Sequence, residues 1–177
     1  MFLDLIRQRR SIRQFTSEPI SKEIRDQLIE AALRSPSSRS FNPWRFIVVD
    51  DPDLLEKLSK AKPHGASFLK NAPLGIVVCA DATASDVWVE DCSIASAFIH
   101  LAAASLGLGS CWIQIRKRDH SQDLSADTYI KDLLLAPDNL MIESIIAIGY
   151  PAEKKDGHTK ETLDYDKVFV NRFDEKD

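Results

Sequence analysis

The sequence predicts an α+β protein in which one central sheet is flanked by helices on both faces. Short apolar runs rich in Ile and Val alternate along the chain with longer segments of helical periodicity. One of these runs, residues 75–80, is apolar at successive positions, which is typical of a strand buried on both faces. Strands separated by helices indicate layers packed on each side of a sheet. No linker, internal repeat or low-complexity tract divides the 177 residues, so we expect a single domain spanning 1–177.

The N-terminal half carries three helical segments and two strands. Ser21 is a typical N-cap, and Pro36 ends the helix that follows it. Asp51 caps the next helix, and Pro52 suits its first turn. The expected helices are 4–8, 21–35 and 52–61, and the expected strands are 46–49 and 75–80.

The C-terminal half is dominated by a long helix at 86–106, which is apolar nearly all round and is closed by Gly107. Its many alanines would let another helix approach closely. Strands at 110–115 and 142–149 follow, with a helix at 126–135 between them. After Tyr150 the chain is polar, except for four large apolar residues that we expect to dock on the body of the protein or on a partner subunit: Val168, Phe169, Val170 and Phe173.

The composition excludes several classes of protein. A net charge of -4 and a pI near 5.6 give no general footprint for nucleic acid or an anionic membrane. The N-terminus shows no signal-peptide pattern, and the longest apolar stretch, 98–108, is too short to span a bilayer. Cys79, Cys92 and Cys111 lie in apolar surroundings and are expected to be reduced, which favours a cytoplasmic location. No CxxC pair occurs and the histidines are scattered, so no metal site is expected.

The most informative segment is Arg9-Arg10-Ser11-Ile12-Arg13, a local concentration of positive charge in an acidic protein. Side chains alternate along an extended backbone, so Arg9, Ser11 and Arg13 would line one side while Ile12 anchors the segment in a core. Guanidinium groups and a hydroxyl suit a phosphate group. Considered alone, the same residues also fit a solvated cluster of charge.

Other sources of chemistry have little support. The glycines of Gly107-Leu108-Gly109-Ser110 follow a helix and open a strand, which is the reverse of a dinucleotide-binding fingerprint. The chain has no Walker pattern and no GxSxG elbow. Cys111 is expected to be an inert buried thiol because it lies in a strand. With no acid, base, nucleophile or metal in view, an organic cofactor is the simplest source of chemistry.

Five segments in order resemble motifs of the nitroreductase family of FMN-dependent oxidoreductases, and together they cover essentially the whole chain. They are residues 9–15, residues 36–38 with 43–46, residues 71–73, Asp91 with 107–113, and residues 148–153. The resemblance implies a nitroreductase-like three-layer fold with a mixed central sheet and an intertwined homodimer. It also implies FMN as cofactor, NADH or NADPH as transient co-substrate, and a small-molecule electron acceptor.

The resemblance also implies how FMN is held. Arg9 and Ser11 would bind the phosphate, with Arg10 supporting the same region. Arg13 would approach the N1/O2 edge of the flavin and support its reduced form. His158 and Lys160 are the first candidates for the basic residue that closes the phosphate site, ahead of Lys154 and Lys155.

Further contacts are implied along the flavin ring. Trp112, Ile113 and Gln114 would lie near N5, whereas Pro36, Ser37, Ser38 and Ser40 would reach the flavin from the other subunit. Many family members have Asn at the position of Ser40 and Gln at that of Asn42, so the contact made by Ser40 would be shorter. No catalytic side chain of the protein is implied, since the chemistry takes place on FMN.

The resemblance implies an FMN-dependent NAD(P)H oxidoreductase that transfers hydride through flavin N5 to nitroaromatics, quinones or similar electrophiles. A reductive dehalogenase or an enone reductase of the same fold is an alternative, although such chemistry needs extra lid segments and this chain of 177 residues is compact. A non-catalytic flavin-binding protein is a third interpretation. No dedicated site for a 2′-phosphate is readable, so the choice between NADH and NADPH stays open.

Overall fold

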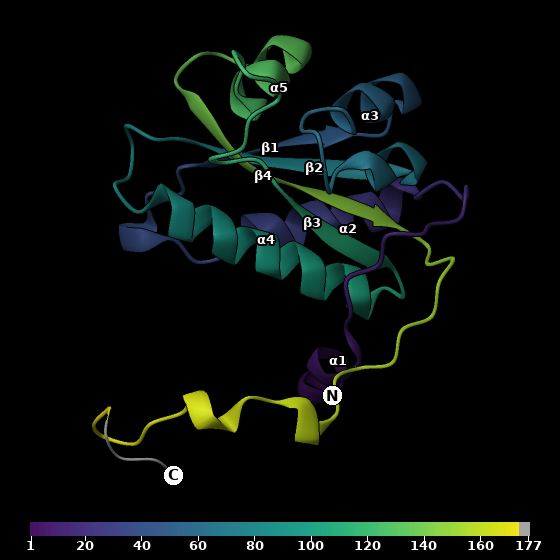
Figure 1. The fold of residues 1–177 in the computed structure, drawn as a ribbon, viewed down its shortest axis with the longest axis vertical. Coiled ribbons are helices and arrows are strands. Elements are labelled where there is room, and N and C mark those ends of the chain that lie inside the picture. The colour runs from purple at the N-terminus through teal and green to yellow at the C-terminus, as the bar shows by residue number, and fades with distance from the viewer. Residues whose placement is uncertain (174–177) are drawn as a thin grey trace.

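The computed structural model describes residues 1–173, which form one sheet of four strands (Figure 1). The strands lie in the order β1 (Trp44–Val49), β2 (Leu74–Asp81), β4 (Leu140–Gly149) and β3 (Gly109–Gln114). The described residues also form five α-helices: α1 (Phe2–Gln8), α2 (Lys22–Leu33), α3 (Pro52–Leu58), α4 (Trp88–Ser105) and α5 (Ala126–Leu134). The predicted order of helices and strands is therefore confirmed.

Helices cover both faces of the sheet, as predicted. On one face α2 and α4 enclose a core that includes Ile76 and Val78 of β2. On the other face α3, α5 and the 3₁₀ turn at Ser67–Asn71 enclose a second core that includes Val77 and Cys79. Successive residues of β2 thus face opposite layers, as the two-residue period of a strand requires. This confirms that the strand is buried on both faces.

The pairing of the strands corrects the predicted mixed sheet. All four strands pair antiparallel with their neighbours. Within residues 1–173 the one parallel pairing is an isolated bridge between Ser11 and Ser110. The sheet of the described residues is therefore antiparallel, and the bridge at Ser11 only joins the N-terminal segment to the edge of β3.

The helix starts follow the predicted caps. Ser21 Oγ accepts a hydrogen bond from the amide of Ile24 at 3.3 Å, and the Asp51 carboxylate accepts from the amide of Leu54 at 2.9 Å. The helix predicted to run to residue 61 ends at Leu58, because the amides of residues 60 and 61 bond three residues back in tight turns.

The long helix α4 is covered on one side only. Cys92, Ala95 and Ile99 are completely buried against the sheet and α2. Ile94 and Phe98 are 39% and 37% exposed. The apolar character all round that the sequence shows therefore leaves an uncovered apolar strip on this chain.

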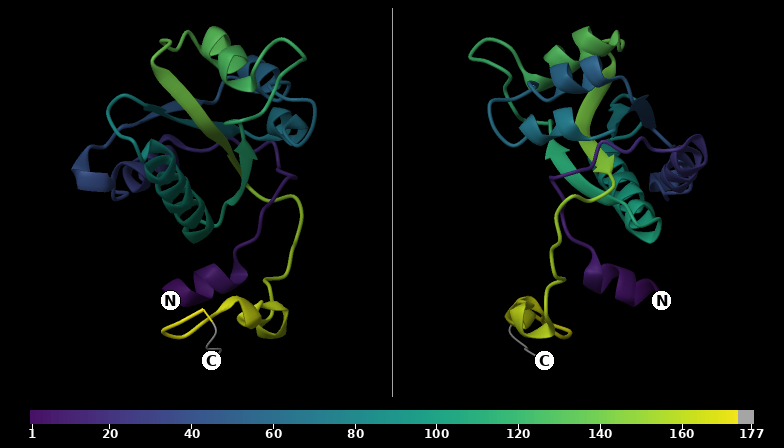
Figure 2. Two further views of the ribbon diagram at one scale, coloured as in Figure 1. Left: turned by 60° about the vertical axis from the view of Figure 1, so that its left-hand side comes forward. Right: turned by 90° about the vertical axis from the view of Figure 1, so that its right-hand side faces the viewer.

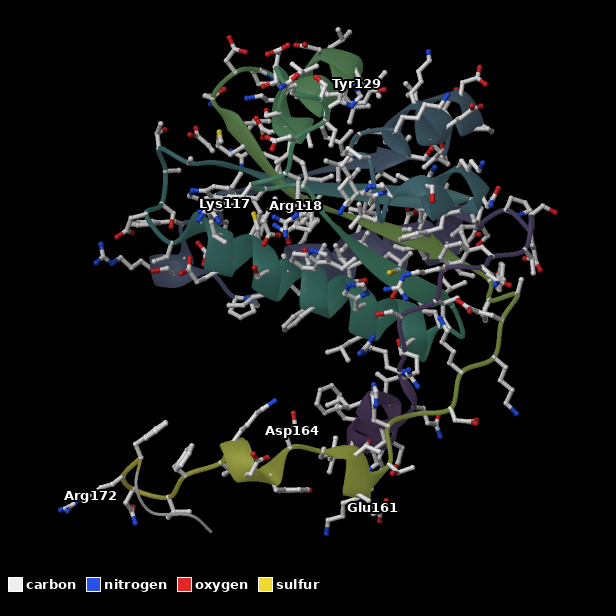
Figure 3. All side chains as sticks on the ribbon, viewed as in Figure 1. Lys117, Arg118, Tyr129, Glu161, Asp164 and Arg172 are labelled. Carbon is white, nitrogen blue, oxygen red and sulfur yellow. The ribbon has the colours of Figure 1, made fainter. Side chains whose placement is uncertain are left out.

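Helix α1 and the tail from residue 158 onward lie outside the layers, on the same side of the body, and α1 contacts α4 (Figures 1 and 2). Figure 3 labels Glu161 and Asp164 on this tail, far from Tyr129 of α5. The tail crosses the end of α1 so closely that a Cβ on Gly157 would lie 2.0 Å from the carbonyl oxygen of Arg7. Many large apolar side chains here are exposed, namely Phe2, Leu3, Ile6, Leu163, Tyr165, Val168, Val170 and Phe173. Within residues 1–173 no helix has the length and apolar character needed to cross a bilayer.

Candidate functional site

The arginine-bearing segment packs beside the free edge of β3. The amide of Ile12 donates to the carbonyl of Ser110 at 3.0 Å, and the amide of Thr16 donates to the carbonyl of Tyr150 at 2.9 Å. A Cβ on Gly109 would come within 2.7 Å of Ile12 Cβ, so glycine is what allows this close approach. Ile12 is buried in the core. Its predicted role as an anchor is confirmed.

Arg9, Arg10 and Ile12 of this segment line a cavity of about 340 Å³, which we call the Arg9 cavity. Four basic side chains line it, together with backbone and side chains of the turn into β3: Arg9, Arg10, Lys154, Lys155, Gly107, Gly109 and Ser110. The guanidinium of Arg10 also donates to the carbonyl of Asp156. Such a group of charged donors suits an anion that accepts several hydrogen bonds.

The next residues along the chain, Arg13, Gln14 and Phe15, line a second cavity of about 640 Å³, which we call the Arg13 cavity. Arg13 and Lys70 bring positive charge to it, and Asn71 adds an amide. The guanidinium carbon of Arg13 is 5.9 Å from the ring centroid of Phe68, so the aromatic ring supports its position. Sequence reasoning assigned no role to Lys70. The signal available was its place directly before the motif at residues 71–73.

The three side chains Arg9, Ser11 and Arg13 do not line one side together, which corrects the prediction. Arg10 joins Arg9 in its cavity, Arg13 faces the other cavity, and Ser11 lines neither. The expected alternation of side chains does not hold over residues 9–13, because α1 ends at Gln8 and the first bridge to β3 is at Ser11. Ser11 instead offers its carbonyl, which accepts a hydrogen bond from Lys155 Nζ at 3.0 Å.

His158 and Lys160, the preferred candidates for closing the phosphate site, lie elsewhere in this chain. They line a separate cavity of about 430 Å³ with Arg7, Leu163 and Tyr165, between α1 and the tail. Lys154 and Lys155 are the residues that the fold brings beside Arg9. The reason is the crossing at Gly157, which carries the chain away from the Arg9 cavity.

The loop predicted to reach a flavin from the other subunit lies at the opposite end of α4. The buried carboxylate of Asp91 accepts hydrogen bonds from the amide of Ser38 at 2.8 Å and from Ser85 Oγ at 3.2 Å. Ser37 Oγ bonds to the side chain and the amide of Asn42. The Arg9 cavity includes Ala104, which is thirteen residues further along α4 and therefore about 20 Å away. One chain does not bring Pro36, Ser37, Ser38 or Ser40 to the Arg9 cavity.

The three residues of β3 that are predicted to contact the flavin ring differ in how far their side chains are buried. Ile113 is completely buried in the core, so its side chain is not available to a ligand. Trp112 and Gln114 are partly buried and are joined by a hydrogen bond of 2.9 Å from the indole Nε1 to the amide oxygen. The imidazole of His100 in α4 stacks near Trp112 and lies 2.7 Å from Ser110 Oγ through Nδ1.

Glu153 is a further residue of this region that sequence reasoning did not place. Its carboxylate oxygen Oε1 accepts from the amides of Arg13 and Gln14, at 2.6 and 3.2 Å, and from Lys155 Nζ at 3.0 Å. These bonds lower the pKa of Glu153, the amide of Arg13 being the largest cause. Glu153 and Arg13 are 140 residues apart in sequence, so no local pattern could have joined them.

The cysteines behave as structural thiols. Burial raises the pKa of Cys111, and raises that of Cys79 to about 11. Cys111 is buried, as expected, and a thiol with a raised pKa is a poor nucleophile. Among residues 1–173 no group of three or more potential metal ligands comes together.

With its layered fold, its central α4 and its two basic cavities beside β3, the chain has the architecture of a nitroreductase-fold protein. The family model described as "Nitroreductase family" matches residues 6–64 and 59–150. The chain belongs to the nitroreductase family, which confirms the resemblance found in the sequence.

Similar proteins support this from sequence and from structure. The chain is 40% identical over 158 residues to an Archaeoglobus fulgidus protein provisionally named an NADH dehydrogenase/NAD(P)H nitroreductase, with 87% of each chain covered. A solved FMN-dependent nitroreductase from Clostridium difficile is 46% identical and superposes with a TM-score of 0.95, covering 97% of this chain and 99% of that one. A nitroreductase-like protein from Desulfovibrio desulfuricans, solved in complex with FMN, is 30% identical with a TM-score of 0.79, each chain being covered to 97%.

Proposed function

We propose that this protein is an FMN-dependent NAD(P)H oxidoreductase that reduces nitroaromatics, quinones or similar small electrophiles. The observation that carries the proposal is the pair of basic cavities lined by successive parts of residues 9–15, built on a fold that FMN-dependent relatives share. One cavity suits the charged end of FMN, and the other suits the polar edge of its ring.

The residues of the Arg9 cavity fit a phosphate monoester. Arg9, Arg10 and Lys155 supply charged donors, and Gly109 keeps the wall of the cavity free of a side chain. Within residues 1–173 none of these arginines is within ion-pair distance of a carboxylate. Their charge is therefore available to a phosphate, which carries about -1.5 to -2 charges near pH 7.

The residues of the Arg13 cavity fit the pyrimidine edge of a flavin. FMN supplies the hydride chemistry between the nicotinamide and the acceptor when it is bound. Arg13 and Lys70 would place fixed positive charge where negative charge develops, and Asn71 would orient the ring by hydrogen bonds. A guanidinium keeps its proton throughout, so Arg13 acts by charge and not by proton transfer.

The site is proposed to be completed by a second copy of the chain. Residues 36–42 and the Arg9 cavity lie at opposite ends of α4, and the exposed strip with Ile94 and Phe98 runs between them. If two α4 helices pack antiparallel about a two-fold axis, the loop of one copy meets the Arg9 cavity of the other. A homodimer would also bury the apolar side chains of α1 and the tail.

The test is a reconstitution of the purified protein. We expect it to be yellow or to bind added FMN stoichiometrically, and to oxidise NADH or NADPH anaerobically until the flavin is bleached. A panel of a nitroaromatic, a quinone, an enone and a halogenated phenol would then identify the acceptor class. A protein that binds no FMN, or whose bound FMN neither nicotinamide reduces, would contradict the proposal. Reoxidation only by the enone or the halogenated phenol would overturn the acceptor class alone.

A further inference from the structure

Glu153 and Lys155 together form a clamp, which we call the Glu153 clamp, on the arginine-bearing segment. The Glu153 carboxylate holds the amides of Arg13 and Gln14, and Lys155 Nζ holds the carbonyl of Ser11. The two side chains also pair with each other at 3.0 Å. Their side chains are 17% and 28% exposed.

The clamp acts where regular pairing leaves the backbone unsupported. The amide of Ile12 pairs with Ser110, the carbonyl of Gln14 with Ala152, and the amide of Thr16 with Tyr150. The amides of Arg13 and Gln14 have the Glu153 carboxylate as their partner instead. An ionised carboxylate is a strong acceptor for two neighbouring amides, so it fixes the backbone from which the Arg13 side chain departs.

The clamp places the negative charge of Glu153 where it would weaken the binding of an anion. Glu153 lines the Arg9 cavity, in which Arg9 and Arg10 are proposed to bind a phosphate. An unscreened carboxylate there would repel the phosphate. The ammonium of Lys155, at 3.0 Å from Glu153, offsets that charge while it also lines the same cavity.

We propose that Glu153 is a positioning residue that fixes Arg13 in its cavity. We further propose that Lys155 neutralises Glu153, so that the clamp does not weaken binding of the anion in the Arg9 cavity. The inference rests on the proposed function, since it takes the anion to be the phosphate of FMN and assigns Arg13 to the flavin edge. It separates two properties: Glu153 controls how readily the bound flavin is reduced, and Lys155 controls how tightly FMN is held.

The experiment compares the wild type with Glu153→Gln, Lys155→Met and the double variant. Glu23→Gln, on the exposed first turn of α2, serves as the control. Each protein is titrated with FMN as apoprotein, and each holoenzyme is examined for its midpoint potential and for its rate of flavin reduction in stopped flow. Hydrogen exchange at the amides of Arg13 and Gln14 is followed in the apoprotein.

Glu153→Gln is expected to bind FMN as tightly as the wild type or more tightly, but to be reduced about tenfold more slowly, at a lowered potential and with faster exchange of both amides. Lys155→Met is expected to weaken FMN binding by about tenfold or more. In the Glu153→Gln background, Lys155→Met should weaken FMN binding clearly less, because no carboxylate is left unscreened. The control should resemble the wild type.

Three outcomes would overturn the inference. A Glu153→Gln variant that loses FMN affinity in step with its reduction rate would show a merely structural role. Unchanged reduction and exchange in that variant would remove Glu153 from the positioning of Arg13. If Lys155→Met weakened FMN binding equally in both backgrounds, Lys155 would not act by neutralising Glu153. A wild type that binds no FMN would refute the proposed function instead, and exchange of the two amides would still report on the clamp.

Discussion

Arg9 provides a direct test of which cavity takes the phosphate. It lines the Arg9 cavity with Lys155, whereas Arg7 lines the separate cavity with His158 and Lys160. Arg9→Ala should weaken FMN binding by roughly tenfold to a hundredfold, because a charge-assisted hydrogen bond to phosphate is lost. Arg7→Ala should leave binding unchanged. Fluorescence titration of the apoproteins measures both, and the opposite result would assign the phosphate to the cavity of His158.

Arg13 is expected to act on reduction more than on binding or folding. Its side chain faces the Arg13 cavity and carries no part of the Arg9 cavity. Arg13→Ala should slow flavin reduction by about tenfold or more, since a fixed charge at the flavin edge is lost, while Arg13→Lys should retain most of the rate. Comparing the stopped-flow rate of flavin reduction by NADH with the thermal midpoint of unfolding separates an effect on reduction from an effect on folding. An alanine variant with unchanged reduction kinetics would remove Arg13 from this role.

His100 predicts how the stability of the apoprotein depends on pH. Burial, and secondly the charge of Arg9, lower the pKa of His100 to about 4 from the ordinary 6.5. Between those values the unfolded chain binds a proton that the folded one does not, so stability falls as the pH is lowered from about 6.5 to 4. The loss is at most about 3 kcal/mol for a shift of this size. Denaturant unfolding across that range should show the loss in the wild type, and a smaller one in His100→Asn.

Among the elements, α1 and the tail depend on each other through Gly157. A Cβ there would lie 2.0 Å from the backbone carbonyl of Arg7, which cannot move without distorting the end of α1. Gly157→Ala should therefore undock the tail at a cost of about 1–3 kcal/mol. Faster hydrogen exchange in α1 and faster proteolysis of the tail would show it. Thr159→Ala, two residues further on and exposed, should change neither.

The helices and strands could be predicted because their signals are local. Ser21, Asp51 and the apolar period of β2 act within a few residues of themselves, and the structure places these elements as expected. The site could be predicted only as far as its motifs are contiguous. The pairing of Glu153 with the amide of Arg13 joins positions 140 residues apart, and no spacing encodes it.

The same limit explains why the sequence does not tell which basic residue lies beside Arg9. Four basic residues lie within seven positions after Glu153, and their spacing does not tell where the chain turns away. The turn is set by the contact of Gly157 with the end of α1, which is tertiary. Lys155 therefore stays in the Arg9 cavity and His158 leaves it.

At the scale of the whole molecule, the fold of one chain leaves its two candidate half-sites at opposite ends of α4. The loop at Ser38 is bonded to Asp91 near the start of the helix, and Ala104 near its end lines the Arg9 cavity. Phe98 lies between them and is 37% exposed. A second copy packed on this strip would bring each loop to the other chain's cavity and would cover the strip at the same time.

This arrangement predicts that dimerisation and FMN binding are lost together. Phe98→Asp places a charge in the proposed interface, where it would be buried without a partner, so the variant should sediment as a monomer. Because residues 36–42 would then be missing from the site, its affinity for FMN should fall by at least tenfold although the Arg9 cavity is intact. Leu135→Asp, at a side chain 91% exposed after α5 on the other layer, should stay dimeric and bind FMN normally. Analytical ultracentrifugation with FMN titration decides the matter: a monomeric Phe98→Asp variant that holds FMN as tightly as the wild type would show that one chain suffices for the site.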